Sequence, residues 1–130
     1  MKFLLDTSIF LRSLDGFDQL NKQAQQVFTE GEEIYLSAAS SWEIVVKYGV
    51  GKLNLPQAPG KWIPETLTKF SIRALPITVT HTIAVAELPT HHKDPFDRIL
   101  VAQARSEGML LMTEDSEVNK YPVEILWCGK

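Results

Sequence analysis

The sequence has a single cysteine, no long apolar run and no excess of basic residues. Because Cys128 is alone, an internal disulfide framework and a four-cysteine zinc site are both excluded. No stretch approaches the roughly 20 apolar residues that a membrane helix needs, and Asp6 interrupts the N-terminal apolar run too early for a signal peptide. We therefore expect a soluble, cytoplasmic protein with no membrane association.

The charge balance is slightly acidic, with 13 Lys and Arg against 16 Asp and Glu and a net charge of −3. Proteins that hold nucleic acid by neutralising phosphates usually carry a basic patch. The longest basic cluster here is only His91-His92-Lys93. If the protein acts on nucleic acid, metal ions must supply much of the positive charge at the phosphate.

The length and the pattern of the chain indicate one α/β domain over residues 1–130. Short apolar runs alternate with segments of helical periodicity, and no repeat or biased segment interrupts them. Strands are expected at 2–5, 33–37, 73–77, 109–113 and 123–127, and helices at 19–30, 38–48, 61–70, 80–88 and from Pro95 to Gly108. This alternation predicts an α/β sandwich with a mainly parallel central sheet.

Four acidic residues stand near the ends of these expected elements. Asp6 directly follows the first strand, and Asp115 follows the strand at 109–113. Glu43 lies one turn into the helix after the second strand, and Asp97 lies in the first turn of the helix that begins at Pro95. Sites in parallel sheets form beyond the carboxyl ends of the strands. We therefore expect the four carboxylates to meet at one edge.

Carboxylates that gather without a lysine or arginine between them repel one another unless protons or cations compensate. Magnesium and manganese suit this role, because they are hard ions that prefer carboxylate oxygen and keep water ligands. An ion held in this way can bind a phosphate oxygen and lower the pKa of its water. The pattern therefore favours phosphodiester hydrolysis.

Each acid also has a structural interpretation. Asp6 and Asp115 are suitable turn residues, and Glu43 is compatible with an exposed helix position. Asp97 would interact favourably with the helix dipole, and Asp94 is explained almost fully as the N-cap. Asp94 therefore stays outside the primary set.

Other residue types suggest competing sites. The three histidines, His81, His91 and His92, invite a metal or acid–base role, although His91 and His92 fall in a polar loop. The lone Cys128 has no nearby partner for nucleophilic chemistry. The three tryptophans, Trp42, Trp62 and Trp127, are expected in the core.

Four motifs carry a resemblance to a known family. They are Leu4-Leu5-Asp6-Thr7-Ser8, Ser41-Trp42-Glu43-Ile44, Asp94-Pro95-Phe96-Asp97-Arg98 and Leu111-Met112-Thr113-Glu114-Asp115. In this order the chain resembles PIN-domain nucleases, and the Asp-Pro-Phe-Asp-Arg helix is similar to the VapC-like toxin branch. The resemblance implies a PIN-like three-layer α/β/α sandwich.

The resemblance also implies a Mg²⁺- or Mn²⁺-dependent endoribonuclease that acts as the toxin of a toxin–antitoxin pair. The residues that it implies for catalysis and metal binding are Asp6, Glu43, Asp97 and Asp115, with Thr7, Ser8, Asp94 and Thr113 in support. The implied partners are RNA, a small antitoxin and a second copy of the chain. The helices at 42–48 and 61–70 are candidates for the antitoxin surface.

Two alternatives remain open at this point. A non-catalytic PIN-like module would bind RNA or protein without cleavage, but it has no need of four mutually repelling acids. A phosphoacceptor receiver domain also uses strand-end aspartates and magnesium. That domain needs a paired acid after the first strand, whereas Asp6 has no acidic neighbour.

Overall fold

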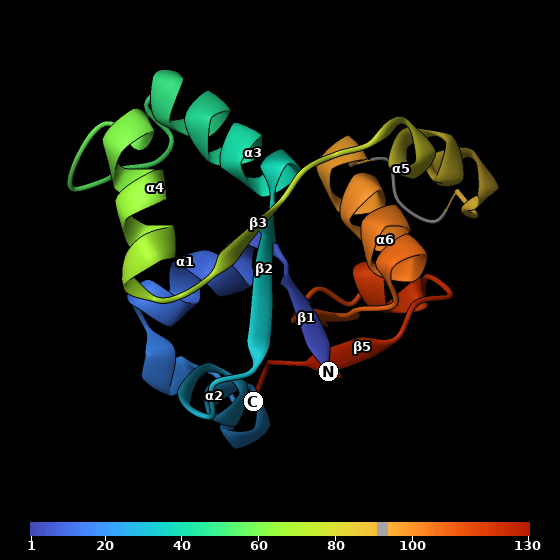
Figure 1. Cartoon of the computed structure of the whole chain (residues 1–130), viewed down its shortest axis with the longest axis horizontal. Helices are drawn as coiled ribbons and strands as arrows, with labels where there is room; N and C mark the ends of the chain where they lie inside the picture. The colour runs from blue at the N-terminus through green and yellow to red at the C-terminus, as the bar shows by residue number, and fades with distance from the viewer. Residues whose placement is uncertain (91–93) are drawn as a thin grey trace.

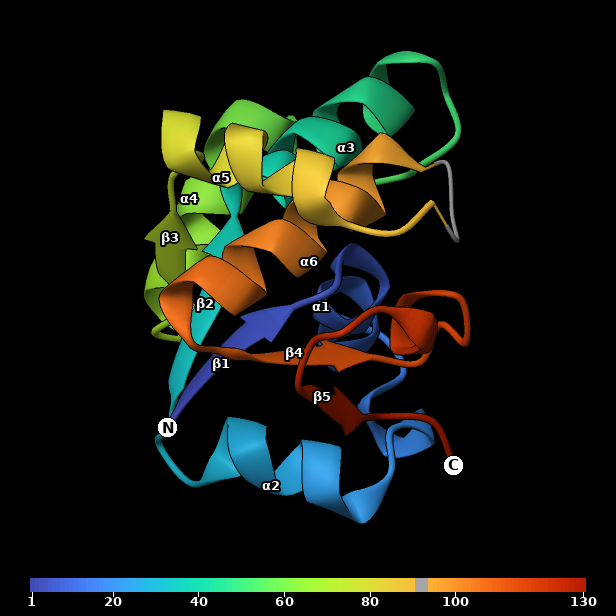
Figure 2. The same cartoon turned by 90° about the vertical axis from the view of Figure 1, so that its right-hand side faces the viewer.

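The computed structural model describes residues 1–90 and 94–130, and in it a parallel sheet is covered by helices on both faces (Figures 1 and 2). The strands are β1 (Lys2–Leu5), β2 (Glu33–Ser37), β3 (Arg73–Leu75), β4 (Leu110–Thr113) and β5 (Ile125–Trp127). The α-helices are α1 (Thr7–Leu14), α2 (Lys22–Thr29), α3 (Ala38–Gly49), α4 (Pro59–Lys69), α5 (Val79–Ala84) and α6 (Pro95–Glu107). Short 3₁₀ helices are η1 (Phe17–Gln19), η2 (Val85–Glu87) and η3 (Val118–Lys120).

The strand order is β3-β2-β1-β4-β5, and within the described residues all neighbouring strands pair in parallel. From β1 the chain builds outward to β2 and β3 on one side, and it then returns to add β4 and β5 on the other. Leu4 of β1 lies in register with Tyr35 of β2 and with Leu111 of β4. Such a reversal of strand order is where open α/β sheets place their sites.

Alternate side chains of β1 point into two different hydrophobic cores, one on each face of the sheet. Phe3 and Leu5 point into the core shared with α1, α2 and α4, whereas Leu4 points into the core shared with α6. Figure 2 shows α2 on one side of the sheet and α5 with α6 on the other. The predicted three-layer α/β/α sandwich is therefore confirmed. The sheet was expected to be mainly parallel, and all of the strand pairs between described residues are parallel.

Helix α3 belongs to both cores. Ala39 in its first turn packs with the α6 side, and Ile44 one turn further packs with the α1 side. The helix starts directly from the end of β2, where the Ser37 hydroxyl accepts a hydrogen bond from the Ala39 N–H. Helix α3 therefore crosses the carboxyl edge of the sheet, and it carries Glu43 there.

Several predicted boundaries were wrong, each for a local reason. The sequence interpretation missed α1 and began α2 too early, because Asn21 caps α2 by accepting from the Ala24 N–H. Helix α4 begins at Pro59, where a missing N–H removes no helical bond. Strand β3 ends at Leu75 because Pro76 cannot donate to a strand ladder. The predicted loop at 90–93 falls mostly outside the described residues.

The expectation for the tryptophans was correct only in part. Trp62 packs against the core edge-to-face with Phe10, but Trp42 is 63% exposed and Trp127 is 38% exposed. Within the described part of the chain, none of the helices combines the length and apolar character needed to cross a bilayer.

Candidate active site at the carboxyl edge of the sheet

The backbone fixes Asp6 between β1 and α1. Its N–H donates to the Met112 carbonyl of β4, and its own carbonyl accepts from the N–H groups of Ile9 and Phe10. The carboxylate does not cap α1; instead it accepts a 2.7 Å hydrogen bond from the Thr113 hydroxyl at the end of β4. Asp6 is therefore bound to both strands that flank the reversal of strand order.

Asp6 is the most strongly perturbed acid of this edge. Only 6% of the residue is exposed, and burial raises the pKa of its carboxyl group from 3.8 to about 6. Hydrogen bonds from the Thr113 hydroxyl and the Thr7 backbone lower this pKa, whereas the charges of Asp115 and Glu43 raise it further. The charges of these two acids therefore act on Asp6.

Thr113 links Asp6 to Asp115. While its hydroxyl donates to Asp6, the same oxygen accepts the Asp115 N–H at 3.0 Å. The Oδ1 atom of Asp115 in turn accepts the Glu117 N–H at 2.9 Å, which closes the turn before η3. The turn interpretation of Asp115 is therefore confirmed. The charge of Asp115 nevertheless raises the pKa of Asp6.

Glu43 has a partner that the sequence interpretation overlooked. Its Oε2 atom lies 2.9 Å from the Nζ atom of Lys47, one turn further along α3. The bond to Glu43 raises the pKa of Lys47, and the charges of Asp94 and Asp97 raise it further. The expectation that no lysine or arginine lies among the acids was therefore wrong. The i,i+4 spacing on a helix was the signal for Lys47.

The start of α6 is confirmed as predicted. Asp94 caps the helix by accepting the Phe96 N–H at 2.9 Å, and Asp97 lies in the first turn, partly buried. Phe96 packs edge-to-face on Trp42 with 5.2 Å between ring centroids. This contact brings the first turn of α6 against α3. The charges of Asp94 and Asp97 therefore act on the same lysine that binds Glu43.

The predicted hydroxyl residues fall in two environments. Thr7 is buried, and its hydroxyl donates to the Ser40 hydroxyl at 2.8 Å, which ties α1 to α3. Ser8 is exposed and lines an open groove of about 1000 Å³ beside α1 and α4. Ser40 was missed, because nothing in the sequence pairs it with Thr7, 33 positions away.

Within residues 1–90 and 94–130, no three Asp, Glu, His or Cys side chains stand close enough to form a ready-made metal-ligand set. Lys47 holds Glu43, and a turn engages one oxygen of Asp115. The donor chemistry is nevertheless that of a hard-ion site, because the four acids are partly or wholly buried carboxylates. Carboxylate oxygens are the type of ligand that Mg²⁺ and Mn²⁺ prefer, so these residues fit either ion in their donor atoms.

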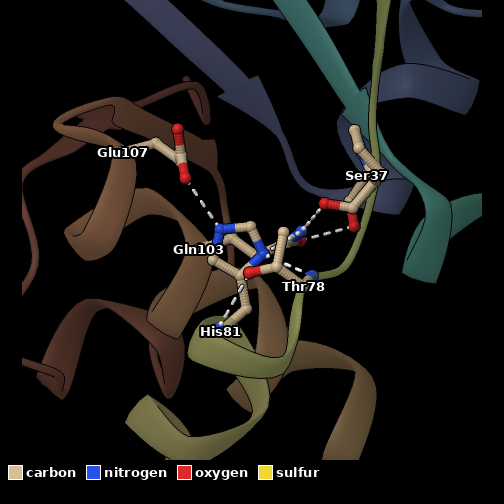
Figure 3. Close-up of polar contacts among 6 residues, drawn as sticks. Ser37, Thr78, His81, Gln103 and Glu107 are labelled. Carbon is tan, nitrogen blue, oxygen red and sulfur yellow. Dashed lines mark hydrogen bonds and ion pairs between the residues drawn. The ribbon is translucent and has the colours of Figure 1, made fainter.

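A second polar cluster lies between β2, α5 and α6 (Figure 3). The Nδ1 atom of buried His81 accepts the Thr78 N–H at 3.0 Å, and its Nε2 atom lies 2.8 Å from the Glu107 carboxylate. Gln103 donates to the Pro76 carbonyl and contacts His81 Nδ1, and it accepts the Ser37 hydroxyl.

The bonds of His81 decide its tautomer. A backbone N–H can only donate, so Nδ1 carries no proton and Nε2 donates to Glu107. All of the polar atoms that could serve a metal or acid–base role on this ring are thus engaged inside the fold. The structure makes His81 a core residue that joins α5 to α6. His91 and His92 lie outside the described residues.

Cys128 is fully buried at the end of β5, and burial, with the charges of Glu114 and Asp6, raises the pKa of its thiol to about 12. A thiol that stays protonated at neutral pH is a poor nucleophile. The cysteine therefore belongs to the core that lies beneath the acidic edge.

Comparison with known proteins gives one curated relative and several similar structures. Ribonuclease VapC16 of Mycobacterium tuberculosis is 32% identical over 65 residues, which cover 50% of this chain and 46% of that protein, so the matched segment spans about half of the relative. VapBC2 of Rickettsia felis, bound to a promoter DNA fragment, is 17% identical with a TM-score of 0.74, and covers 98% of this chain and 99% of its own. FitAcB of Neisseria gonorrhoeae is 19% identical with a TM-score of 0.62, over 95% and 96%.

These structural likenesses show the fold, because the identities are below one fifth. The family follows from a different comparison. The model of the PIN domain matches residues 3–124, a span that takes in most of β1, the whole of β4 and all four acids. The chain therefore belongs to the PIN domain family.

Proposed function

We propose that this protein is a Mg²⁺- or Mn²⁺-dependent endoribonuclease that hydrolyses RNA phosphodiester bonds as the toxin of a toxin–antitoxin pair. The carrying observation is Asp6, a buried carboxylate whose pKa is raised to about 6 and on which the charges of Asp115 and Glu43 also act. Burying a carboxylate beside other acids is unfavourable, and strongly perturbed acids at a sheet edge are typical of functional sites. The similarity to Ribonuclease VapC16 supports the RNA substrate.

In this proposal Asp6, Glu43, Asp97 and Asp115 hold the divalent ion. The bound ion supplies a water of lowered pKa and neutralises charge at the phosphate. The protein supplies the placement: the Thr113 hydroxyl orients the Asp6 carboxylate, and the Thr7–Ser40 bond keeps α1 against α3. Asp94 fixes where α6 begins, and this sets the position of Asp97 at the edge.

The partner that we propose is a small antitoxin with an amphipathic segment. VapBC2, which shares this fold, is bound to a fragment of promoter DNA, and another structure with this fold is a toxin–antitoxin complex from Klebsiella pneumoniae. The groove beside Ser8 is lined in part by apolar side chains of α1, of α4 and of the C-cap that follows α4, among them Leu11, Leu14, Trp62 and Phe70. Such a lining suits the apolar face of a helix. The exposed Val79 and Ile83 of α5 offer a further apolar face for a homodimer.

The experiment that tests the function compares two acids of one helix. We expect wild-type protein to cleave RNA with Mg²⁺ or Mn²⁺ and to stop when the ion is chelated. Asp97→Asn should lower the rate by roughly 100-fold or more, because even residues behind metal ligands commonly contribute 10- to 100-fold. Asp94→Asn is the matched control with a milder effect, because Asn is also a good N-cap. Melting curves check that both variants are folded.

Equal and complete loss in both variants would contradict the assignment of Asp97 over Asp94. Binding of RNA without cleavage under any divalent ion would favour the non-catalytic module instead. Co-expression with the product of a neighbouring small reading frame should give a copurifying complex with suppressed cleavage. Separate elution with full activity would contradict the toxin–antitoxin part of the proposal.

A further inference from the structure

Lys47 occupies an unusual place for a helix-surface lysine. Glu–Lys pairs at i,i+4 are common on exposed helices, where both side chains are solvated and the pair contributes little. Here the Glu43 side chain is only 13% exposed, while that of Lys47 is 51% exposed. The ammonium group therefore reaches inward from the rim to a carboxylate that the site holds mostly out of water.

The surroundings of Lys47 come from two helices. Glu43 on its own helix accepts the 2.9 Å bond, and the carboxylates of Asp94 and Asp97 at the start of α6 act on the same ammonium group. The Trp42–Phe96 ring contact holds these two helices together. Lys47 thus provides positive charge among the acids for which the proposed function needs a divalent ion.

We propose that Lys47 is the built-in counter-ion of the acidic site and competes with the divalent ion for Glu43. The inference rests on the proposed metal-dependent function. The ammonium group occupies the Oε2 atom of Glu43, and an ammonium group and a divalent cation at one carboxylate repel each other. Lys47 therefore opposes loading of the site for as long as its ammonium group stays at Glu43. Lys47 thereby weakens ion binding and stabilises the ion-free protein.

The experiment measures Mn²⁺ binding directly, by calorimetric titration of chelator-treated protein. Lys47→Met should bind Mn²⁺ roughly 2- to 5-fold more tightly than wild type, the range expected from one partly exposed ion pair. Lys47→Arg keeps the charge and should stay close to wild type. Lys22→Met is the matched control for net charge, because Lys22 is exposed at the start of α2, across the sheet from α3 (Figure 2).

Melting curves give the second measurement. Without Mn²⁺, Lys47→Met should melt below wild type, because Glu43 loses its counter-charge beside the other acids. With Mn²⁺, its melting temperature should rise more than that of wild type, because a tighter ligand stabilises more. An ion pair with only a structural role would instead lower both melting temperatures equally and leave the Mn²⁺ affinity unchanged.

The outcomes separate this inference from the proposed function. If wild-type protein binds no Mn²⁺, the metal-dependent function itself loses its support. If wild type binds Mn²⁺ and Lys47→Met binds it equally or more weakly, Lys47 does not compete for Glu43 and the inference is wrong. Tighter binding by Lys22→Met to the same degree would attribute the effect to net charge rather than to the site.

Discussion

The His81 network and the acidic edge both place polar side chains inside the molecule, yet they partner these groups in different ways. In the network, each donor of His81 and Gln103 meets an acceptor, and the groups at its centre are neutral. At the edge, the Asp6 carboxylate accepts a hydrogen bond from Thr113, yet the charges of Asp115 and Glu43 act on it unfavourably, and Glu43 itself is paired with Lys47.

This difference separates a structural role from a functional one. Buried polar groups that are all hydrogen-bonded make a fold more specific without demanding a ligand. Buried charges that lack a full set of partners destabilise the chain that carries them, and they persist where a ligand completes them. The contrast therefore predicts opposite responses: neutral substitutions should destabilise the network and should stabilise the edge.

The largest expected effect is in the network. Gln103→Leu removes the partner of the Ser37 hydroxyl and of the Pro76 carbonyl at a position with no exposure. Leaving buried polar groups unpaired should lower the free energy of unfolding by about 2–4 kcal/mol, measured by urea denaturation. Gln23→Leu, on the exposed side of α2, is the matched control and should change it by less than about 0.5 kcal/mol. A loss as small as the control's would show that the network is dispensable.

The second-largest expected effect is a gain in stability, caused by a neutral substitution at Asp6. Its folded pKa of about 6 exceeds the ordinary 3.8, so the folded protein binds the proton more tightly than the unfolded chain does. Wild-type stability is therefore favoured at low pH and falls as pH rises from about 4 through 6. Asp6→Asn keeps an oxygen for the Thr113 hydroxyl and removes the charge. It should raise the free energy of unfolding by about 2–3 kcal/mol at pH 7, and by almost nothing at pH 3.5.

The measurement is urea denaturation of chelator-treated protein at several pH values. Asp18→Asn, at an exposed position of η1, is the control and should show no such trend. If Asp6→Asn were less stable than wild type at pH 7, burial would not penalise the Asp6 charge, and the contrast between edge and network would fail.

The sequence predicted the architecture well because its signals are local. The alternation of apolar runs and helical segments, with Asp94-Pro95 at a helix start, required no knowledge of contacts. Helix α1 was missed because its residues follow Asp6 without a break. A helix that begins within one residue of a strand offers no separating loop to detect.

The candidate site was predictable only in its residue types. Strand ends indicated where Asp6 and Asp115 would lie, and the charges of both were found to interact. The partners were not predictable in the same way: Thr7 with Ser40, and Ser37 with Gln103, are 33 and 66 positions apart. Lys47 was within reach of sequence reasoning through its spacing from Glu43, but its role depends on Asp94 and Asp97 of another helix.

The smallest expected effect tests whether the network is neutral throughout. Glu107 is its one charged member, and its side chain is 40% exposed. Because His81 Nδ1 accepts the Thr78 N–H, the ring donates from Nε2 without carrying a charge, and a glutamine oxygen at position 107 can accept the same bond. Glu107→Gln should therefore lower the free energy of unfolding by less than about 1 kcal/mol, since a half-exposed pair is screened by water. Urea denaturation at pH 7, with the ¹⁵N shifts of the His81 ring to report its tautomer, provides the measurement. A loss above about 2 kcal/mol with a doubly protonated ring would show an imidazolium–carboxylate pair, and the network would then depend on charge, as the acidic edge does.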